Sequence, residues 1–399
     1  MNMIFGILNV IFYCLGIYLL ANVLYLLYFA IAGFFKIKLP YAPTQNHRRI
    51  CVLIPAYKED AVIIESALDA KLHQYEGEFD VCVIADKLMP STIETLSLHN
   101  VKVIEVRFEK STKGKALSTA LSALPLDAYD LAVVLDADNI MGPAFLEKVN
   151  SAFEAGYKVI QGHRTAKNQD TPFALLDACN EEINNHLFRR GHQRSGLSAA
   201  LIGSGMAFDY HYLIKLLSGI GETVGEDKEI DFRIIKDGIK IAYLEDAWVY
   251  DEKVADSGVF LNQRTRWIAA QIEFLKKYFI EGFVLLFRNG NIEFFNKMIQ
   301  TLLLPRILLL GVLSLFVVIS FALPVGPSPL FWLVTLICCG AALLLSLPKR
   351  LYNKDLIKAV VRLPLAFITM CIALLSINKA KKSFIHTPHT SNSKLPINK

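Results

Sequence analysis

The first 35 residues of the chain contain no Asp, Glu, Lys or Arg, and residues 4–35 form an almost unbroken apolar run. Crossing a hydrocarbon core takes about 20 apolar residues, so this run is long enough to span with some tilt. A cleaved signal peptide would carry a basic start, a shorter apolar core and a small-residue cleavage site, none of which is present. We therefore expect a retained transmembrane helix over residues 1–36.

The net charge is small, and the cysteines show no recognisable spacing. Each of these observations argues against a class of protein. The formal net charge of +5 is small, and basic residues beside the apolar segments explain most of it, which argues against nucleic acid as a partner. The seven cysteines show no metal-ligand spacing and no disulfide framework, so reduced thiols are expected. No internal repeat or low-complexity region is present.

A phosphate-binding P-loop is absent too. Lys113-Gly114-Lys115 is not followed by Ser or Thr, and no glycine stands five residues upstream of the Gly-Lys pair. This tripeptide either supplies positive charge near a diphosphate or forms a solvated turn, and we favour the turn.

Long apolar segments return in the C-terminal part of the chain, over residues 301–378. Residues 307–325 and 330–347 are expected to span the bilayer. The shorter segment 363–377 either spans with basic side chains reaching the interface, lies in the interface or re-enters. Residues 379–399 form a basic tail.

Basic residues beside these segments predict their orientation, because such residues stay on the cytoplasmic side. They are Lys36, Lys38, Arg48, Arg49, Lys349, Arg350 and Lys354. The polar middle of the chain is therefore expected to face the cytoplasm. If all four apolar segments crossed, the basic tail would lie outside, so 363–377 is the segment expected not to cross.

The polar middle, residues 37–267, alternates β-rich runs with helical patterns. The runs are residues 50–56, 79–85, 101–106, 131–135 and 157–161. Short apolar runs separated by helices predict an α/β domain with a mostly parallel sheet covered on both faces. Ligands bind such sheets outside the carboxyl ends of the strands. Three runs end there in polar residues, namely 57–59, Asp86 and 136–138.

Two acidic pairs are candidates for chemistry. Asp136 and Asp138, one residue apart, can both approach a hard divalent cation, although the same pattern occurs in solvated turns. Asp227, next to Glu226, can act as a general base or can simply favour a helix N-terminus through the helix dipole. A residue in that position can do both.

The string Gln263-Arg264-Thr265-Arg266-Trp267 joins a phosphate clamp to a flat aromatic face on which a sugar ring can rest. The alternative is an arginine-rich interfacial helix with Trp267 as a membrane anchor. Residues 268–300 continue amphipathically, either along the membrane surface or as an ordinary packing helix.

The glycines of a short run, Gly203-Ser204-Gly205, would let the backbone approach an acceptor; a plain β-turn is the alternative.

Taken in order, these residues resemble a membrane-embedded family 2 glycosyltransferase of the GT-A (Rossmann-like) fold, flanked by one N-terminal and two to three C-terminal transmembrane helices. The chain is similar over residues 48–270 to bacterial processive synthases of cellulose, hyaluronan and poly-N-acetylglucosamine. The resemblance implies donor contacts from Ala56, Tyr57, Glu59, Asp86, Asp136, Gln263 and Arg266. It implies acceptor contacts from Trp267, Gly203, Ser204 and Gly205, a metal on Asp138 with Asp136, and Asp227 as catalytic base.

The activity implied by this resemblance is inverting transfer of a sugar from a UDP-sugar to a growing β-linked polysaccharide, with Mg²⁺ or Mn²⁺ as cofactor. It would take place at the cytoplasmic face of a bacterial inner membrane, among membrane lipids and with a homo-oligomer or an accessory export partner. One departure is that Asp86 is followed by Lys-Leu-Met-Pro instead of a second acid. The alternatives are a single-addition enzyme acting on a lipid acceptor, and a transporter or scaffold with a decayed domain. Intact acids at all three sites argue against the last.

Overall fold

The computed structural model describes residues 2–35, 41–220, 225–253 and 257–375. The strands are β1 (Ile50–Tyr57), β2 (Phe79–Asp86), β3 (Lys102–Val106), β4 (Leu131–Val134), β5 (Ile140–Met141), β6 (Val159–Ala166), β7 (Met206–Asp209) and β8 (Ile241–Asp251). The helices of the first half are α1 (Asn2–Phe34), α2 (Ile63–Lys71), α3 (Pro90–Leu98), α4 (Lys113–Ala123), α5 (Phe145–Glu154), α6 (Pro172–Asn184), the π-helix η1 (Asn185–Gly191) and α7 (His192–Arg194). The later helices are α8 (Tyr210–Leu217), α9 (Glu226–Lys236), α10 (Ser257–Asn289), α11 (Ile292–Leu302), α12 (Arg306–Ala322), α13 (Pro329–Leu345), the 3₁₀ turn η2 (Lys349–Leu351), α14 (Lys354–Val361) and α15 (Leu363–Leu375).

All eight strands belong to one sheet, in the order β3-β2-β1-β4-β7-β6-β8-β5. The α/β class is confirmed, but the expected mostly parallel sheet is found only in part. Strands β3, β2, β1 and β4 are parallel, whereas β7 runs antiparallel between β4 and β6, and β5 runs antiparallel to β8. The sheet is therefore mixed, and β5, β7 and β8 were not anticipated from the sequence.

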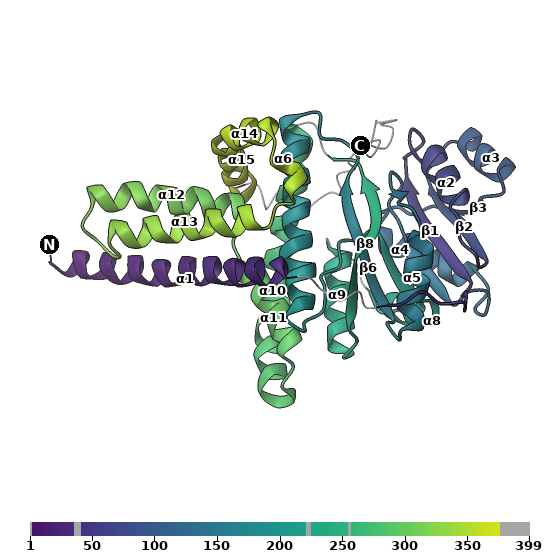
Figure 1. Cartoon of the computed structure of the whole chain (residues 1–399), viewed down its shortest axis with the longest axis horizontal. Coiled ribbons are helices and arrows are strands. Elements are labelled where there is room, and N and C mark those ends of the chain that lie inside the picture. The colour runs from purple at the N-terminus through teal and green to yellow at the C-terminus, as the bar shows by residue number, and fades with distance from the viewer. Residues whose placement is uncertain (1, 36–40, 221–224, 254–256, 376–399) are drawn as a thin grey trace.

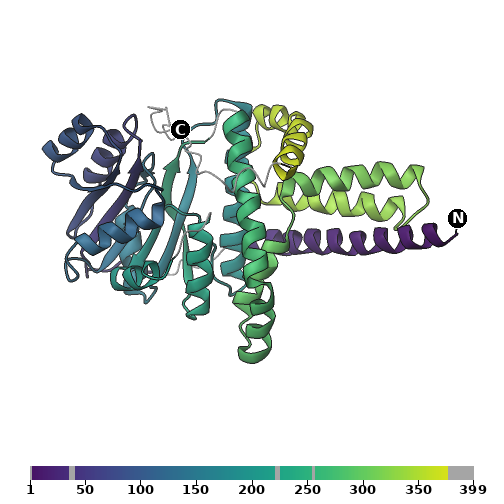
Figure 2. The ribbon, with the colours of Figure 1, turned by 180° about the vertical axis from the view of Figure 1, so that it is seen from behind.

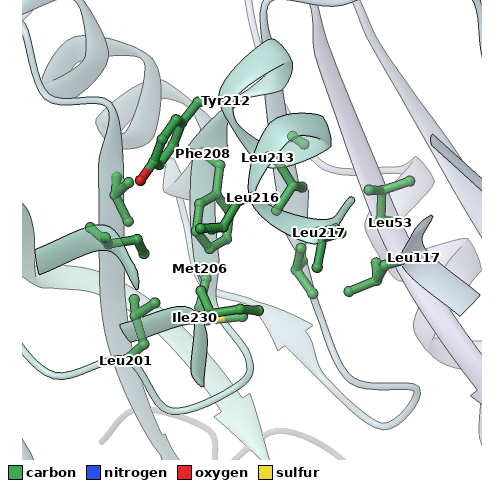
Figure 3. Close-up of a cluster of buried hydrophobic side chains, with 14 of the residues drawn as sticks. Leu53, Leu117, Leu201, Met206, Phe208, Tyr212, Leu213, Leu216, Leu217 and Ile230 are labelled. Atoms are coloured by element: carbon green, nitrogen blue, oxygen red, sulfur yellow. The ribbon is translucent and has the colours of Figure 1, made fainter. Parts of the chain in front are cut away.

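The apolar runs form strands because both faces of the sheet are covered. Along β1, Ile50 and Val52 join one buried cluster with α2 and α5, while Cys51 and Leu53 join the opposite cluster. Successive side chains of a strand point to opposite faces, so a strand that is buried on both sides needs apolar residues at every position. Figure 3 shows the second cluster, in which Leu53 and Leu117 lie on one side and Met206 and Ile230 on the other. The seven cysteines are free thiols, as expected.

The apolar helices project from the α/β domain. Figures 1 and 2 show α1, α12 and α13 side by side, pointing away from the sheet, with α10 and α11 running across their inner ends. Among the described residues, α1 is the one single helix that is long and apolar enough to cross a bilayer. Helices α11 and α12 pass the same test as a pair bent by 58°, and α13 and α15 are shorter apolar helices. Lys36, Lys38 and residues 379–399 lie outside the described residues, so the orientation stays a prediction.

Helix α10 packs on the α/β domain with one side, and a position along the membrane surface stays a prediction. On one side Phe274 and Tyr278 are buried and stack on Phe232 of α9. On the other side Ile280 and Phe287 are 75% and 81% exposed. The helix thus packs on the α/β domain and leaves an apolar edge uncovered.

A close helix contact joins α1 to the α/β domain. A Cβ on Gly191, at the end of η1, would lie 2.5 Å from the carbonyl oxygen of Phe29 in α1. Only glycine permits this approach, so the α1 and η1 backbones meet directly. The imidazole Nε2 of His186 also lies 2.8 Å from the carbonyl oxygen of Ala30. The inner end of α1 is therefore held by the α/β domain.

Candidate active site

The turn that follows β4 carries the two aspartates of the predicted metal site. The backbone N–H of Asp136 donates to Oδ1 of Asn139 at 3.2 Å and to Oγ of Ser204 at 3.1 Å, which fixes the turn. The side chain of Asp136 is 34% exposed, whereas Asp138 is 1% exposed. One carboxylate therefore faces the outside of the domain and the other faces its interior.

Asp138 is held from two directions. Its Oδ2 accepts the backbone N–H of Glu252 at 2.8 Å, and its Oδ1 accepts the amide of Asn139 at 3.2 Å. The same amide of Asn139 also donates to Oδ1 of Asp251 at 3.0 Å. These bonds connect the turn to the end of β8.

The donor set of this turn fits a hard divalent cation. Carboxylate oxygens are the ligands that Mg²⁺ and Mn²⁺ prefer, and an oxygen that accepts one hydrogen bond keeps a lone pair. Within the described residues, no group of three or more His, Cys, Asp or Glu side chains is arranged to hold a metal. Asp136 and Asp138 would thus supply two ligands, and substrate phosphates and water would supply the others.

Two cations lie against Asp136. The ammonium of Lys113, at the start of α4, donates to the Asp136 carboxylate and, at 2.6 Å, to the carbonyl oxygen of Gly203. The guanidinium of Arg164 lies 3.7 Å from Oδ2 of Asp136. Our preference for a solvated turn at residues 113–115 was therefore wrong. Residue 113 begins a helix, and its charge lies at the acidic site.

Arg164 belongs to a buried ionic cluster that sequence reasoning missed. It pairs with Glu181 of α6 at 2.9 Å and lies 3.9 Å from Asp251, which accepts from Lys253 at 2.6 Å. Burial acts to raise the pKa of Glu181, but Arg164, Lys253 and Arg189 outweigh it and hold that pKa below its usual value. The sequence carried no local signal for this cluster, because the predicted run ended at residue 161 and the burial of all eight residues of β6 is known only from the structure.

The Gly203-Ser204-Gly205 run lies between the Asp136 turn and α9. Gly203 has φ +86°, and a Cβ built there would lie 3.8 Å from Oδ2 of Asp227. Ser204 is fully buried and donates to Oδ1 of Asn139, and its carbonyl accepts from Gln161 at 2.9 Å. Hydrogen bonds therefore hold this turn in place between Asp136 and Asp227. Gln161, which supplies one of them, was not predicted from the sequence.

Helix α9 begins with the second acidic pair. Glu226, Asp227 and Glu229 all lie in its first turn, where the helix dipole favours negative charge. Glu226 accepts the backbone N–H of Gly114, so α9 and α4 meet at their N-termini. Burial raises the pKa of Glu226, and the neighbouring Asp227 carboxylate adds to the effect, against hydrogen bonds from Thr112 and Gly114. Asp227 is partly exposed, as Glu226 is, and within the described residues it carries no hydrogen bond of the kind that ties Glu226 to Gly114.

The aromatic–cationic string lies on α10. Burial lowers the pKa of Arg266, and attraction to Asp227 opposes that shift. Trp267 is 39% exposed, and the guanidinium carbon of Arg264 lies 4.3 Å from its ring centroid. Oε1 of Gln263 is buried without a hydrogen-bond partner among the described residues.

A cavity of about 430 Å³ opens beside this string, and Asp227, Arg266 and Trp267 line it together. Its wall continues through α11 and the start of α12 to Leu26 of α1 and Met370 of α15. Asp136 and Asp138 are not part of this wall. Asp227 therefore stands between the Lys113–Asp136 pair on one side and a cavity bordered by the apolar helices on the other.

The remaining predicted donor residues lie at the ends of β1 and β2. Tyr57 pairs in register with Asp86, and the ammonium groups of Lys58 and Lys87 lie 5.5 and 5.1 Å from the Tyr57 ring centroid. Asp86 is 3% exposed, and its Oδ1 is buried without a hydrogen-bond partner among the described residues.

Ala56 and Glu59 are also buried at this end of β1. These residues share the sheet edge with the Asp136 turn, because β2, β1 and β4 are parallel neighbours. The donor residues at the ends of β1 and β2 are thus separate from the cavity that Asp227 lines, whose wall among the described residues does not include Asp86.

Comparison with solved structures places this arrangement in a known fold. A mannosyltransferase, PcManGT from Pyrobaculum calidifontis, solved in complex with GDP-Man and Mn²⁺, is similar with a TM-score of 0.57 and 17% identity. The match covers 91% of this chain and 100% of that chain. Glucosyl-3-phosphoglycerate synthase from Mycobacterium tuberculosis, solved with Mn²⁺ and UDP, matches 52% of this chain and 72% of its own at 18% identity and a TM-score of 0.33.

Comparison of sequences identifies the family. No curated protein sequence matches the chain. The signature described as "Glycosyltransferase like family 2" matches residues 47–270, which is more than half of the chain and includes every strand of the sheet. It also includes the Asp136 turn, Asp227 and the string that ends at Trp267. The chain therefore belongs to glycosyltransferase family 2.

Proposed function

We propose that this protein is a membrane-bound inverting glycosyltransferase that moves a sugar from a nucleoside diphosphate donor to an acceptor hydroxyl. The observation that carries the proposal is the position of Asp227. It lies 3.8 Å from the Cβ position of Gly203, whose carbonyl binds Lys113, and it also lines the cavity with Arg266 and Trp267. A base between a cation-lined donor side and an open acceptor side is what a displacement reaction requires.

On the donor side, Asp136 and Asp138 would hold Mg²⁺ or Mn²⁺. When bound, this ion would neutralise negative charge on the diphosphate leaving group. The resemblance of the motifs favours a UDP-sugar as donor, and the GDP-Man bound to the solved mannosyltransferase supports a GDP-sugar as the second candidate. Lys113 adds a further positive charge beside Asp136. The unpartnered Oδ1 of Asp86 accepts a hydrogen bond from the nucleoside, next to the Tyr57 ring.

On the acceptor side, Asp227 takes the proton of the attacking hydroxyl. That oxygen forms a bond to the anomeric carbon while the bond from this carbon to the diphosphate breaks, and the electron pair leaves with the nucleotide. Arg266 holds charge beside Asp227, and Trp267 offers its uncovered surface to a sugar ring. Gln263 and the 203–205 turn position the donor and acceptor around this base.

Membrane attachment is part of the proposal. Helix α1 exposes large apolar side chains along its length, with Val10, Ile17 and Phe34 at 64%, 68% and 68% exposure. Helices α12 and α13 expose similar residues, including Phe321 at 75%. Such surfaces are stable in lipid and costly in water. We therefore place α1, α12 and α13 in the bilayer and the α/β domain on its cytoplasmic side.

Two acceptors are candidates. A growing β-linked polysaccharide follows from the Gln-x-x-Arg-Trp string, and an accessory partner or a second copy would then complete its export path. A lipid acceptor is favoured by the cavity itself, because Leu26, Leu304 and Met370 in its wall belong to, or directly precede, apolar helices.

The test uses the purified full chain in detergent with Mn²⁺ and a panel of UDP- and GDP-sugars. We expect nucleotide release with at least one donor and a product whose size separates single addition from a polymer. Asp227→Asn is expected to lower turnover by about 10²- to 10⁴-fold while donor binding remains measurable. Full activity in Asp227→Asn, or no binding of any sugar nucleotide, would contradict the proposal.

A further inference from the structure

The cavity beside Trp267 is lined by more positive than negative charge. Its cations are Arg189, Lys228, Arg264, Arg266, Lys297 and Arg306. Among the described residues, its carboxylates are those of Asp227 and Asp231. Such an excess attracts an anion, and the effect is stronger in a hollow with low-dielectric walls than on an open surface.

Ion pairs compensate some of these cations but not all. Lys297 pairs with Asp231 at 2.6 Å, Arg264 with Asp177 at 2.5 Å and Arg189 with Glu181 at 3.5 Å. Lys228 and Arg306 have no carboxylate within 4.0 Å among the described residues. Two positive charges in this cavity thus lack a close counter-charge from the chain.

Arg306 is the more informative of the two. Its Nη2 donates to the side-chain oxygens of Asn180 at 2.5 Å and of Asn184 at 2.8 Å, which fixes the guanidinium. Its Nη1 is buried and has no hydrogen-bond partner among the described residues. Buried donors are almost always bonded, and an orphan charged donor is especially unfavourable.

The backbone around Arg306 is built to form this cavity. Helices α11 and α12 meet at an angle of 58°, and Leu303, Leu304 and Pro305 at the break all line the cavity. Nε2 of Gln271 satisfies two carbonyls freed by the break, those of Thr301 at 3.1 Å and of Leu303 at 2.6 Å. The break thus places a cation at the start of an apolar helix, directly beside apolar wall residues.

We infer that the cavity binds the headgroup of a phosphate-bearing membrane lipid that carries the acceptor hydroxyl. The inference rests on the proposed function and specifies its acceptor. The phosphate lies against Arg306 and Lys228, the apolar chain leaves along α1, α12 and α15, and the hydroxyl faces Asp227. Attack by a hydroxyl releases a proton, which Asp227 accepts.

The chemistry of the base selects among phosphate lipids. If an ionised phosphate oxygen were itself the nucleophile, no proton would be released and Asp227 would have no proton to take. A lipid with a free hydroxyl beyond its phosphate therefore matches both halves of the cavity, the cationic wall and the carboxylate.

The test measures lipid binding to the full chain in an uncharged maltoside detergent with three probes of matched chemistry. Phosphatidylglycerol has chains, phosphate and hydroxyls; diacylglycerol lacks the phosphate; glycerol 3-phosphate lacks the chains. We expect phosphatidylglycerol to bind at least fivefold more tightly than either other probe. Equal binding of diacylglycerol would overturn the phosphate assignment, and equal binding of glycerol 3-phosphate would reveal a soluble anion site instead of a lipid site.

Variants then locate the binding. Arg306→Gln and Lys228→Gln are each expected to raise the Kd of phosphatidylglycerol about tenfold. Lys236→Gln, an exposed lysine on the same helix as Lys228 and outside this cavity, should leave it unchanged. Unchanged lipid affinity in the folded Lys228→Gln variant would overturn the inference even if Arg306→Gln failed to fold.

Binding of the sugar nucleotide with Mn²⁺, measured on the same samples, should be unaffected by these variants. If the unaltered protein bound no sugar nucleotide, that result would count against the proposed function. Failure of the lipid inference and failure of the proposed function are therefore distinguishable.

Discussion

Lys113 and Asp136 form an ion pair, although one residue begins helix α4 and the other follows strand β4, 23 positions later. The pair places a fixed ammonium on the more exposed of the two carboxylates proposed to hold the metal. Because Lys113 also binds the Gly203 carbonyl, it connects the proposed donor side to the turn beside Asp227.

Removing this ammonium should weaken the use of the donor. Lys113→Met is expected to lower kcat/KM for the sugar nucleotide about 10- to 100-fold, because the positive charge beside Asp136 and the hydrogen bond to the Gly203 carbonyl are lost. Steady-state assays of nucleotide release would measure the change. Lys115→Met, two positions along the same helix, is the matched control and should stay near the unaltered protein; equal losses in both variants would contradict a specific role for Lys113.

Neutralising the predicted metal ligands should raise the metal requirement. Asp138→Asn is expected to raise the Mn²⁺ concentration for half-maximal activity at least tenfold, because a neutral amide is a weaker ligand than a carboxylate. Metal titrations at saturating donor would show the shift. Asp127→Asn, an exposed acid in the loop before β4, should not change the titration. An unaltered titration with Asp138→Asn would remove this residue from the metal site.

The left-handed backbone at Gly203 should matter for turnover as well as for stability. Gly203 and Gly238 have φ +86° and +72°, and alanine at either position is strained by about 1–2 kcal/mol. Both alanine variants should therefore lose a few degrees of thermal stability.

Only Gly203→Ala is expected to lower kcat, because relaxation of that turn moves the carbonyl that binds Lys113 beside Asp227. A Cβ at Gly238 meets nothing within 4 Å. Equal kcat values in the two folded variants would contradict the positioning role of the turn.

Acid should weaken the attachment of the C-terminal helices to the α/β domain. Glu182 of α6 accepts from Arg350, which follows α13, at 2.5 Å and from Thr165 at 2.7 Å. Burial acts to raise the pKa of Glu182, but His163, Arg350 and Thr165 outweigh it and lower the pKa from 4.5 to about 2. A lowered folded-state pKa stabilises the protein above pH 4.5, and this contribution of up to about 3 kcal/mol is lost as pH falls toward 2.

Thermal unfolding of Glu182→Gln in detergent would measure this contribution. The variant should be less stable than the unaltered protein at pH 7, and the difference should shrink between pH 5 and pH 3. Glu245→Gln removes a more exposed pair, with Arg190 at 3.3 Å, and should cost much less. A stability difference for Glu182→Gln that is constant with pH would contradict the ionic explanation.

Much of the α/β domain follows from local sequence. The apolar runs around Val52, Val83 and Val133 form strands where expected. A short, continuous apolar run is typical of a strand whose two faces are both buried, so the local sequence is enough to predict it. Strand β7 was missed, since four residues after a Gly-Ser-Gly turn carry little local signal. Its place is decided by antiparallel pairing with β4 and β6, which are far away in the chain.

The order of the acids and of the string ending in Trp267 is readable from the chain alone, because residue identity and hydropathy are local properties. So is the presence of a long uncharged helix at the start. The partners of the charged groups are not readable, because pairing depends on which helices and strands the fold brings within a few ångströms. Only the tertiary structure places Lys113 on Asp136, buries Arg164 beside Glu181, and leaves Arg306 with an unused donor in a cavity bordered by apolar helices.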